Sequence, residues 1–147
     1  MTRAPEVLTL ARSWIGTPYV HQASRKGAGS DCLGLLRGIW VALYGSEPEP
    51  TPAYTPDWSE PQGNEVLWAA AARHLRQKRW SDAVPGDVVL FRMQSGCVAK
   101  HLGILANGLP DQSFIHAYSG HGVVESQLTA PWRRRVVTCF EFPDRSS

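Results

Sequence analysis

The chain has 147 residues, of which 43% are hydrophobic and 19% are charged, and its formal net charge is +2. This length supports one domain with its own core, and the composition excludes a long disordered chain and a repeat fibre. The small net charge gives no reason to expect a nucleic-acid partner, because such proteins concentrate a basic face. We interpret the one basic run, Arg133–Arg135, as a solvated or edge-strand face, with contact to an anionic polymer or partner as the alternative.

The cysteines and the N-terminal segment indicate where the chain is made. Its three cysteines form no C-x-x-C pair and leave at least one thiol free in any disulfide scheme. The segment MTRAPEVLTLARSWIG has charges and a proline where a secretory signal needs an apolar core, and nowhere do about 18 apolar residues run together. We therefore expect synthesis in the cytoplasm without a signal peptide, and no membrane partner.

The first half of the chain has helical periodicity. Apolar residues recur at helical spacing over 5–15, between a proline in the first turn and a glycine stop. A second helix begins at Asp31 or Cys32 and ends at Gly45, and a third is expected over about 64–79. The proline-rich segment 46–63 has no helical or strand period, and its aromatic residues predict an ordered surface loop.

The periodicity changes after Pro85. Short β-branched or aromatic runs, separated by turn residues, then follow one another as in an antiparallel meander. These runs are 86–93, 101–108, 113–120, 122–128 and 135–142. Because the helices come before the strands, we expect a single α+β domain over 1–147, with the helices packed on one face of a curled sheet.

Cys32 lies where a glycine-rich loop, 27–30, enters the predicted second helix. A lone cysteine is most often a small buried hydrophobe. A tight loop of this kind exposes the first helical turn, however. The backbone N–H groups and the dipole of that turn stabilise a thiolate and can hold an oxyanion. Cys32 is therefore a candidate nucleophile.

A cysteine nucleophile needs a base and a group that orients the base. His101 opens one predicted strand and His116 lies in the next. A hairpin centred between Gly108 and Leu109 would place the two histidines opposite each other on one face of the sheet. His101 would then be the base, and His116 would hold its second ring nitrogen. Two separately satisfied polar residues remain the alternative.

Two alternatives use the same residue types. Cys97, four residues before His101, is a rival nucleophile that lacks a helix start. A zinc site would draw its ligands from Cys97, His101, His116, His121 and Cys139. No paired spacing such as C-x-x-C or H-x-x-x-H supports that site, so we expect neither a metal nor another cofactor. Cys97 and Cys139 are interpreted as structural.

Five motifs follow one another along most of the chain: GTPYVHQA (16–23), GSDCLGL (29–35), PGDVVLF (85–91), KHLGIL (100–105) and FIHAYSG (114–120). Together they resemble the NlpC-type cell-wall peptidases, which are papain-like cysteine amidases. Within that family, GTPYVHQAS with DCLGLLRGIW is most similar to the branch encoded with phage tails and gene transfer agents. The resemblance implies a papain-like α+β fold.

The resemblance also implies the roles of individual residues. It implies a Cys-His-His triad of Cys32, His101 and His116. The Tyr19 hydroxyl would assist the oxyanion or the substrate backbone, and Asp31 would contact the amino end of the stem peptide. Many relatives have Phe-Asp-Cys-Ser-Gly where this chain has SDCLG, and the proline-rich loop is longer than in minimal members. These departures concern the substrate pocket.

The expected substrate is a stem-peptide amide of bacterial peptidoglycan, usually the D-γ-glutamyl-diaminopimelate bond in relatives. Because this polymer lies outside the cytoplasmic membrane, we expect the chain to be built into the tail tip of a phage-like particle. A tail hub or baseplate protein would dock on the first helix or on the loop 46–63. The alternatives are a cytoplasmic amidase that recycles muropeptides, a catalytically silent structural plug of the tail tip, and a thiol acyltransferase acting on lipids. The last alternative lacks an amphipathic membrane segment.

Overall fold

Helices and a sheet make up a papain-like α+β fold, as expected. The computed structural model of the protein describes residues 3–47, 66–92 and 99–143. The helices are α1 (Ala4–Ser13), α2 (Cys32–Tyr44), α3 (Val66–His74) and α4 (Ala130–Arg134), together with a 3₁₀ turn over Trp80–Asp82. None of the helices in these ranges is both long and apolar enough to cross a membrane.

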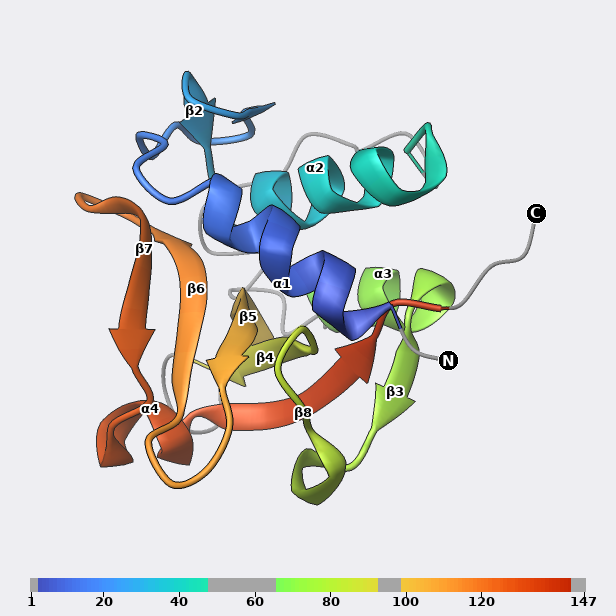
Figure 1. Ribbon diagram of the computed structural model, residues 1–147, viewed down its shortest axis with the longest axis vertical. Coiled ribbons are helices and arrows are strands. Elements are labelled where there is room, and N and C mark those ends of the chain that lie inside the picture. The colour runs from blue at the N-terminus through green and yellow to red at the C-terminus, as the bar shows by residue number, and fades with distance from the viewer. Residues whose placement is uncertain (1–2, 48–65, 93–98, 144–147) are drawn as a thin grey trace.

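The main sheet is antiparallel and has six strands in the order β3-β8-β4-β5-β6-β7 (Figure 1). Its strands are β3 (Arg76–Lys78), β4 (Val88–Arg92), β5 (Ala99–Asn107), β6 (Ser113–Tyr118), β7 (Gly122–Gln127) and β8 (Val136–Glu141). The expected meander is confirmed for β4 to β7, but β8 does not continue it. β8 crosses back and pairs with β4, with Val88 opposite Phe140. The strands β1 (Ser24–Arg25) and β2 (Gly29–Ser30) form a separate two-stranded sheet.

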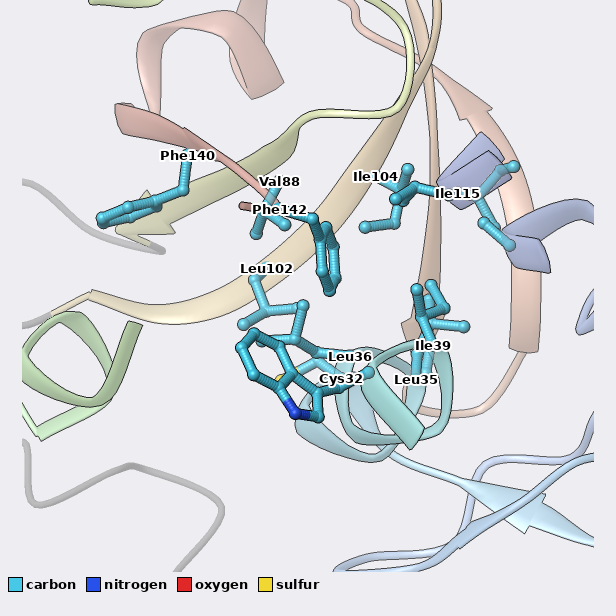
Figure 2. Packing of buried hydrophobic residues seen from close by; sticks show 14 of the residues in the cluster. Cys32, Leu35, Leu36, Ile39, Val88, Leu102, Ile104, Ile115, Phe140 and Phe142 are labelled. Atoms are coloured by element: carbon cyan, nitrogen blue, oxygen red, sulfur yellow. The ribbon is translucent and has the colours of Figure 1, made fainter. Parts of the chain in front are cut away.

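Helices α1 and α2 contact each other, and both contact the sheet. Their shared core is a cluster of aliphatic and aromatic side chains from α1, α2 and the inner face of the strands. Figure 2 shows Leu35 and Ile39 of α2 close to Ile104 of β5 and Ile115 of β6, and all four are fully buried. Burying such side chains contributes roughly 1.5–3 kcal/mol each, so this packing fixes α2 on the sheet.

The predicted third helix is wrong at its C-terminal end. The helix stops at His74, and the next residues form the edge strand β3, which pairs with β8. A tertiary contact explains the change, because the Lys78 ammonium lies 2.7 Å from the buried carboxylate of Asp87. Pairing with β8 satisfies the backbone of this segment, and it overrides a local preference for helix that is worth only tenths of a kcal/mol per residue.

The expected register of the histidine hairpin is wrong by two residues. Ile104 pairs with Ile115, so the same register places Tyr118 opposite His101, and His116 comes two residues before that position. The connection is longer than the motif NGLP, because β6 begins only at Ser113. The β5–β6 register also shifts just before the turn. A shift of two keeps both histidines on one face, because side chains alternate along a strand.

Other expectations fall partly or wholly outside the described residues. Most of the proline-rich loop, 48–63, and the rival thiol Cys97 lie outside them. The basic run lies in and just after α4, a short helix between β7 and β8 that the sequence did not predict. Arg133 and Arg134 are exposed there, in a helix rather than on an edge strand.

Candidate active site

Cys32 is the first residue of α2, and it is 6% exposed. Asp31 caps the helix, because its backbone is extended and its Oδ1 accepts a hydrogen bond of 2.8 Å from the Gly34 N–H. This cap satisfies one of the amides that a helix start leaves without a partner, and it fixes the residue at which the helix begins. The positive end of the helix dipole therefore lies at Cys32, where it favours a thiolate.

The loop in front of α2 is tied to the helix start. Asp31 Oδ2 accepts a hydrogen bond of 2.7 Å from the Gln22 N–H, and Ser24 Oγ donates one of 2.6 Å to the Gly34 carbonyl. A Cβ on Gly34 would lie 1.9 Å from the Ala23 carbonyl oxygen, so this close approach requires a glycine. Both carboxylate oxygens of Asp31 thus accept hydrogen bonds from backbone N–H groups, and the residue is 1% exposed. A contact between Asp31 and substrate stays a prediction.

Tyr19 lies beside the helix start. Its backbone forms an isolated parallel β-bridge with Ser30. Its half-buried ring packs against the core cluster that contains Cys32. Burial, with smaller contributions from the charges of Cys32 and Asp31, raises the pKa of Tyr19 to about 12. The Tyr19 hydroxyl therefore keeps its proton at neutral pH and remains a hydrogen-bond donor next to the thiol.

His101 on β5 and His116 on β6 are in direct contact, with 2.7 Å between His101 Nε2 and His116 Nδ1. Gly103 leaves room for this pair, because a Cβ there would lie 3.1 Å from the Cβ of His116. His101 is 8% exposed and His116 is fully buried. Burial lowers the pKa of His101 to about 4, and burial with the charges of His101 and His121 lowers the pKa of His116 to about 3. Both imidazoles are therefore neutral at pH 7.

Aromatic rings enclose the two imidazoles. The Trp132 ring of α4 lies 5.8 Å from the ring of His101 and 5.4 Å from that of His116. Phe114 lies 4.2 Å from His116, and Tyr118 stacks on His116 at 5.2 Å. The alternation of side chains along β6 places Phe114, His116 and Tyr118 on one face and could have predicted part of this enclosure. No sequence signal indicated Trp132.

Ser126 of β7 is a further residue that the sequence reasoning missed. Its Oγ lies 2.9 Å from His116 Nε2, so the second ring nitrogen of His116 also has a partner. Serine is common on strand surfaces, and nothing in the run GVVESQL distinguishes this residue. Only the pairing of β6 with β7 reveals the contact.

The helix that carries Cys32 packs against both histidine strands. Cys32 shares a core cluster with Leu102 and Ala117, the residues that follow His101 and His116 along the chain. The fold thus places the helix start with Tyr19 and Asp31 alongside the strands of the imidazole pair. Because side chains alternate along a strand, His101 and His116 point to the face opposite Leu102 and Ala117. Contact between the Cys32 thiol and the His101 imidazole, which nucleophilic catalysis requires, stays a prediction.

The remaining histidines have other partners. The His21 Nδ1 atom lies 3.7 Å from Asp31 Oδ2, and the exposed His121 ring stacks on Tyr118 at 5.1 Å. His74 lies on α3, with its ring 6.0 Å from that of Trp40. Among the residues that the structure describes, no group of three or more His, Cys, Asp or Glu side chains could hold a metal ion.

Comparison with known proteins gives a family match over most of the chain. A model of the NlpC/P60 family matches residues 16–141. The chain is 29% identical over 132 residues to a γ-DL-glutamyl hydrolase of Bacillus subtilis, covering 90% of this chain and 27% of that protein. It is 28% identical over 123 residues to the murein DD-endopeptidase MepS/murein LD-carboxypeptidase of Escherichia coli K12, covering 83% and 54%. The chain thus spans about half or less of these curated relatives.

Solved structures share the fold. The NlpC/p60 domain of the peptidoglycan hydrolase SagA superposes with a TM-score of 0.63 at 21% identity, covering 95% of this chain and 98% of that one. An NlpC/P60 family protein from Bacillus cereus also gives a TM-score of 0.63, at 20% identity, covering 95% and 40%. At these identities the likeness concerns the arrangement of helices and strands.

Proposed function

Because the chain belongs to the NlpC/P60 family, whose members are peptidoglycan-cleaving cysteine peptidases and amidases, we propose that it hydrolyses a stem-peptide amide of bacterial peptidoglycan. The observation that carries this proposal is the 2.7 Å hydrogen bond between His101 Nε2 and His116 Nδ1. This bond leaves Nδ1 of His101 as the ring nitrogen for a thiol. The proposal requires the sulfur of Cys32, at the start of the helix that packs on both strands, to face that nitrogen.

The proposed reaction has two stages. His101 Nδ1 takes the proton of the Cys32 thiol, and the sulfur attacks the carbonyl carbon of the amide. The C–N bond breaks as His101 gives this proton to the leaving nitrogen, and the acyl group stays on the sulfur. His101 then takes a proton from water, whose oxygen attacks the thioester. Cys32 leaves as a thiol when His101 returns the proton, and the carboxylic acid is released.

Three groups beside the thiol have roles in this proposal: two donate hydrogen bonds to the developing negative charge, and one contacts the substrate. The Cys32 backbone N–H, at the positive end of α2, and the Tyr19 hydroxyl would both donate to the tetrahedral oxyanion. The pKa of Tyr19, raised to about 12, supports this role because the hydroxyl stays protonated. Asp31 holds the loop and the helix start, and we retain it as the candidate contact for the amino end of the stem peptide.

The bond that we propose is the one between D-γ-glutamate and diaminopimelate. The name of the Bacillus subtilis relative, a γ-DL-glutamyl hydrolase, agrees with a glutamyl bond. The Escherichia coli relative is named a DD-endopeptidase and LD-carboxypeptidase, which are activities on other bonds. Because the relatives' names disagree, analysis of the cleavage products has to decide which bond is cut.

The narrower setting that we propose is the tail tip of a phage-like particle, with a tail hub or baseplate protein as partner. The motif spellings GTPYVHQAS and DCLGLLRGIW support it. Particles purified from the source cells would be analysed by peptide mass spectrometry, and tail peptides together with this chain are expected. Recovery from the cytoplasm alone would favour muropeptide recycling instead.

The test of the activity is mass spectrometry of purified muropeptides and intact sacculi after incubation with the protein under reducing conditions. We expect the wild type to release a defined stem-peptide fragment and Cys32→Ala to release none. Cys139→Ala is the matched control. Cys139 is buried in β8, and its pKa is raised to about 11 by burial and by the charge of Asp87, so it stays a protonated thiol.

The controls separate a lost nucleophile from a lost fold. Circular dichroism and thermal unfolding should show that both variants keep the fold of the wild type. Cleavage by Cys32→Ala would overturn the assignment of the nucleophile. A folded wild type that cuts neither substrate would overturn the enzymatic proposal for the isolated chain, and the structural plug would become the better account.

A further inference from the structure

The hydrogen bond between the two histidines continues to a third side chain. His116 Nε2 lies 2.9 Å from the Oγ of Ser126, and His116 Nδ1 lies 2.7 Å from His101 Nε2. β6 and β7 pair with Phe114 opposite Ser126 and with His116 opposite Val124. Ser126 is therefore the diagonal neighbour of His116 on the same face of the sheet. Three adjacent strands thus supply one chain of hydrogen-bonding groups.

The charged state of the base fixes the direction of these hydrogen bonds. When His101 has taken a proton it carries N–H groups at both ring positions, so its Nε2 must donate to His116 Nδ1. A neutral His116 that accepts at Nδ1 carries its only proton at Nε2. That N–H can donate only to the oxygen of Ser126, so in this state Ser126 must be the acceptor.

The opposite direction is unproductive. If His116 carried its proton at Nδ1, it would donate to His101 Nε2, and a neutral His101 would then carry its own proton at Nδ1. His101 Nδ1 could not take a proton from a thiol in that state. The neutral pair therefore has two arrangements that differ in which tautomer His116 adopts, and only one of them contains a base.

Burial makes the partner of His116 Nε2 important. His116 is fully buried, and an N–H group without an acceptor in such a place has the full cost of desolvation. Burial also lowers the pKa of His116 to about 3, which keeps the ring neutral and makes its tautomer the variable that matters. A hydroxyl oxygen at 2.9 Å stabilises the Nε2–H tautomer.

We propose that Ser126 is a positioning residue that accepts a hydrogen bond from His116 Nε2–H and so holds His101 in the tautomer whose Nδ1 is free to act as a base. The inference rests on the proposed function for its effect on rate. Its effect on the histidine tautomers does not depend on any activity.

The test compares three variants with the wild type. Ser126→Ala removes the oxygen, and Ser126→Thr keeps it with a β-branched side chain that suits a strand. Ser113→Ala is the matched control, because this β6 serine donates a hydrogen bond of 2.7 Å to Glu125 and touches neither histidine through its hydroxyl. Long-range ¹H–¹⁵N correlation spectra of uniformly ¹⁵N-labelled protein report the tautomers, and cleavage of a purified muropeptide gives kcat/KM.

We expect His116 to be the Nε2–H tautomer in the wild type, in Ser126→Thr and in Ser113→Ala. Ser126→Ala should shift it toward the Nδ1–H tautomer and lower kcat/KM by about 10- to 100-fold, the range for an unpaired buried donor. Ser126→Thr should restore both readings.

An Nδ1–H tautomer of His116 in the wild type would overturn the proposal, and so would tautomers that do not change in Ser126→Ala. A loss of rate in Ser113→Ala equal to that in Ser126→Ala would also overturn it, because a general effect of strand serines would then explain the loss. If the wild type cleaves nothing while the tautomers respond as expected, the proposed function fails and the positioning role of Ser126 stands.

Discussion

The thiol side and the imidazole side of the proposed site are built in different ways. On the thiol side, the Asp31 carboxylate accepts hydrogen bonds from the backbone N–H groups of Gln22 and Gly34. These contacts join residues that are close together in the sequence. On the imidazole side, His116 contacts rings and a hydroxyl from α4, β5 and β7. Local backbone hydrogen bonds therefore hold the nucleophile, whereas strand pairing and ring packing hold the base. A substitution should affect the two sides through different quantities.

Tyr19→Phe tests the chemistry of the thiol side without changing its packing. The ring stays in place while the hydroxyl is lost, so we expect kcat/KM to fall by about 10²- to 10³-fold, as for one lost oxyanion donor. Thermal unfolding should change little, and steady-state cleavage of a muropeptide gives the rate. Activity within about threefold of the wild type would remove Tyr19 from the oxyanion site and leave the backbone N–H of Cys32 as the donor.

Lowering the pH should lower the free energy of unfolding through the imidazole side. The pKa of His101 is about 4 in the folded protein against 6.5 without burial, so between these values the unfolded chain binds more protons. The free energy of unfolding should therefore be full above about pH 6.5 and fall as the pH decreases toward 4, by roughly 3 kcal/mol for this group. Urea unfolding of the wild type and of His101→Asn from pH 4 to 7 measures the effect. Equal pH dependence in the two proteins would contradict it.

Asp31→Ala should give the smallest of these effects. It removes the cap of α2 and the anchor of Gln22, and we expect the free energy of unfolding to fall by about 1–2 kcal/mol. Asp31→Asn keeps the Oδ1 acceptor and should lose less, and urea unfolding at neutral pH distinguishes the two. The tautomers of the histidine pair should not change in either variant. If Asn is as costly as Ala, the charge of Asp31 rather than its cap holds the loop.

The thiol side could be read from the sequence because its signals are local. The expected start of the second helix, Asp31 or Cys32, is confirmed, because α2 begins at Cys32 with Asp31 as its N-cap. The left-handed Gly45, with a φ of 93°, likewise ends α2 at the predicted residue. Short-range hydrogen bonds link residues whose separation is fixed in the chain, so a pattern in the sequence is sufficient.

The imidazole side could be read only in part. The expected hairpin placed His101 and His116 on one face, which is correct, but its centre was wrong because the connection runs past the motif NGLP to Gln112 and the register shifts before the turn. The contacts of Trp132 and Ser126 with the histidines depend on how α4 and β7 pack on the sheet. Such contacts join distant parts of the chain, and no local pattern specifies them.

The return of β8 to β4 has a consequence for folding during synthesis. β4 pairs with β5 on one side and with β8 on the other, and β3 joins the sheet only through β8. A ribosome releases the strands that carry both histidines before it releases β8. Until then the outer edge of β4, formed of buried residues such as Val88 and Leu90, has no partner strand. Unpaired apolar edges template aggregation, so we expect the nascent chain to need protection until β8 is made.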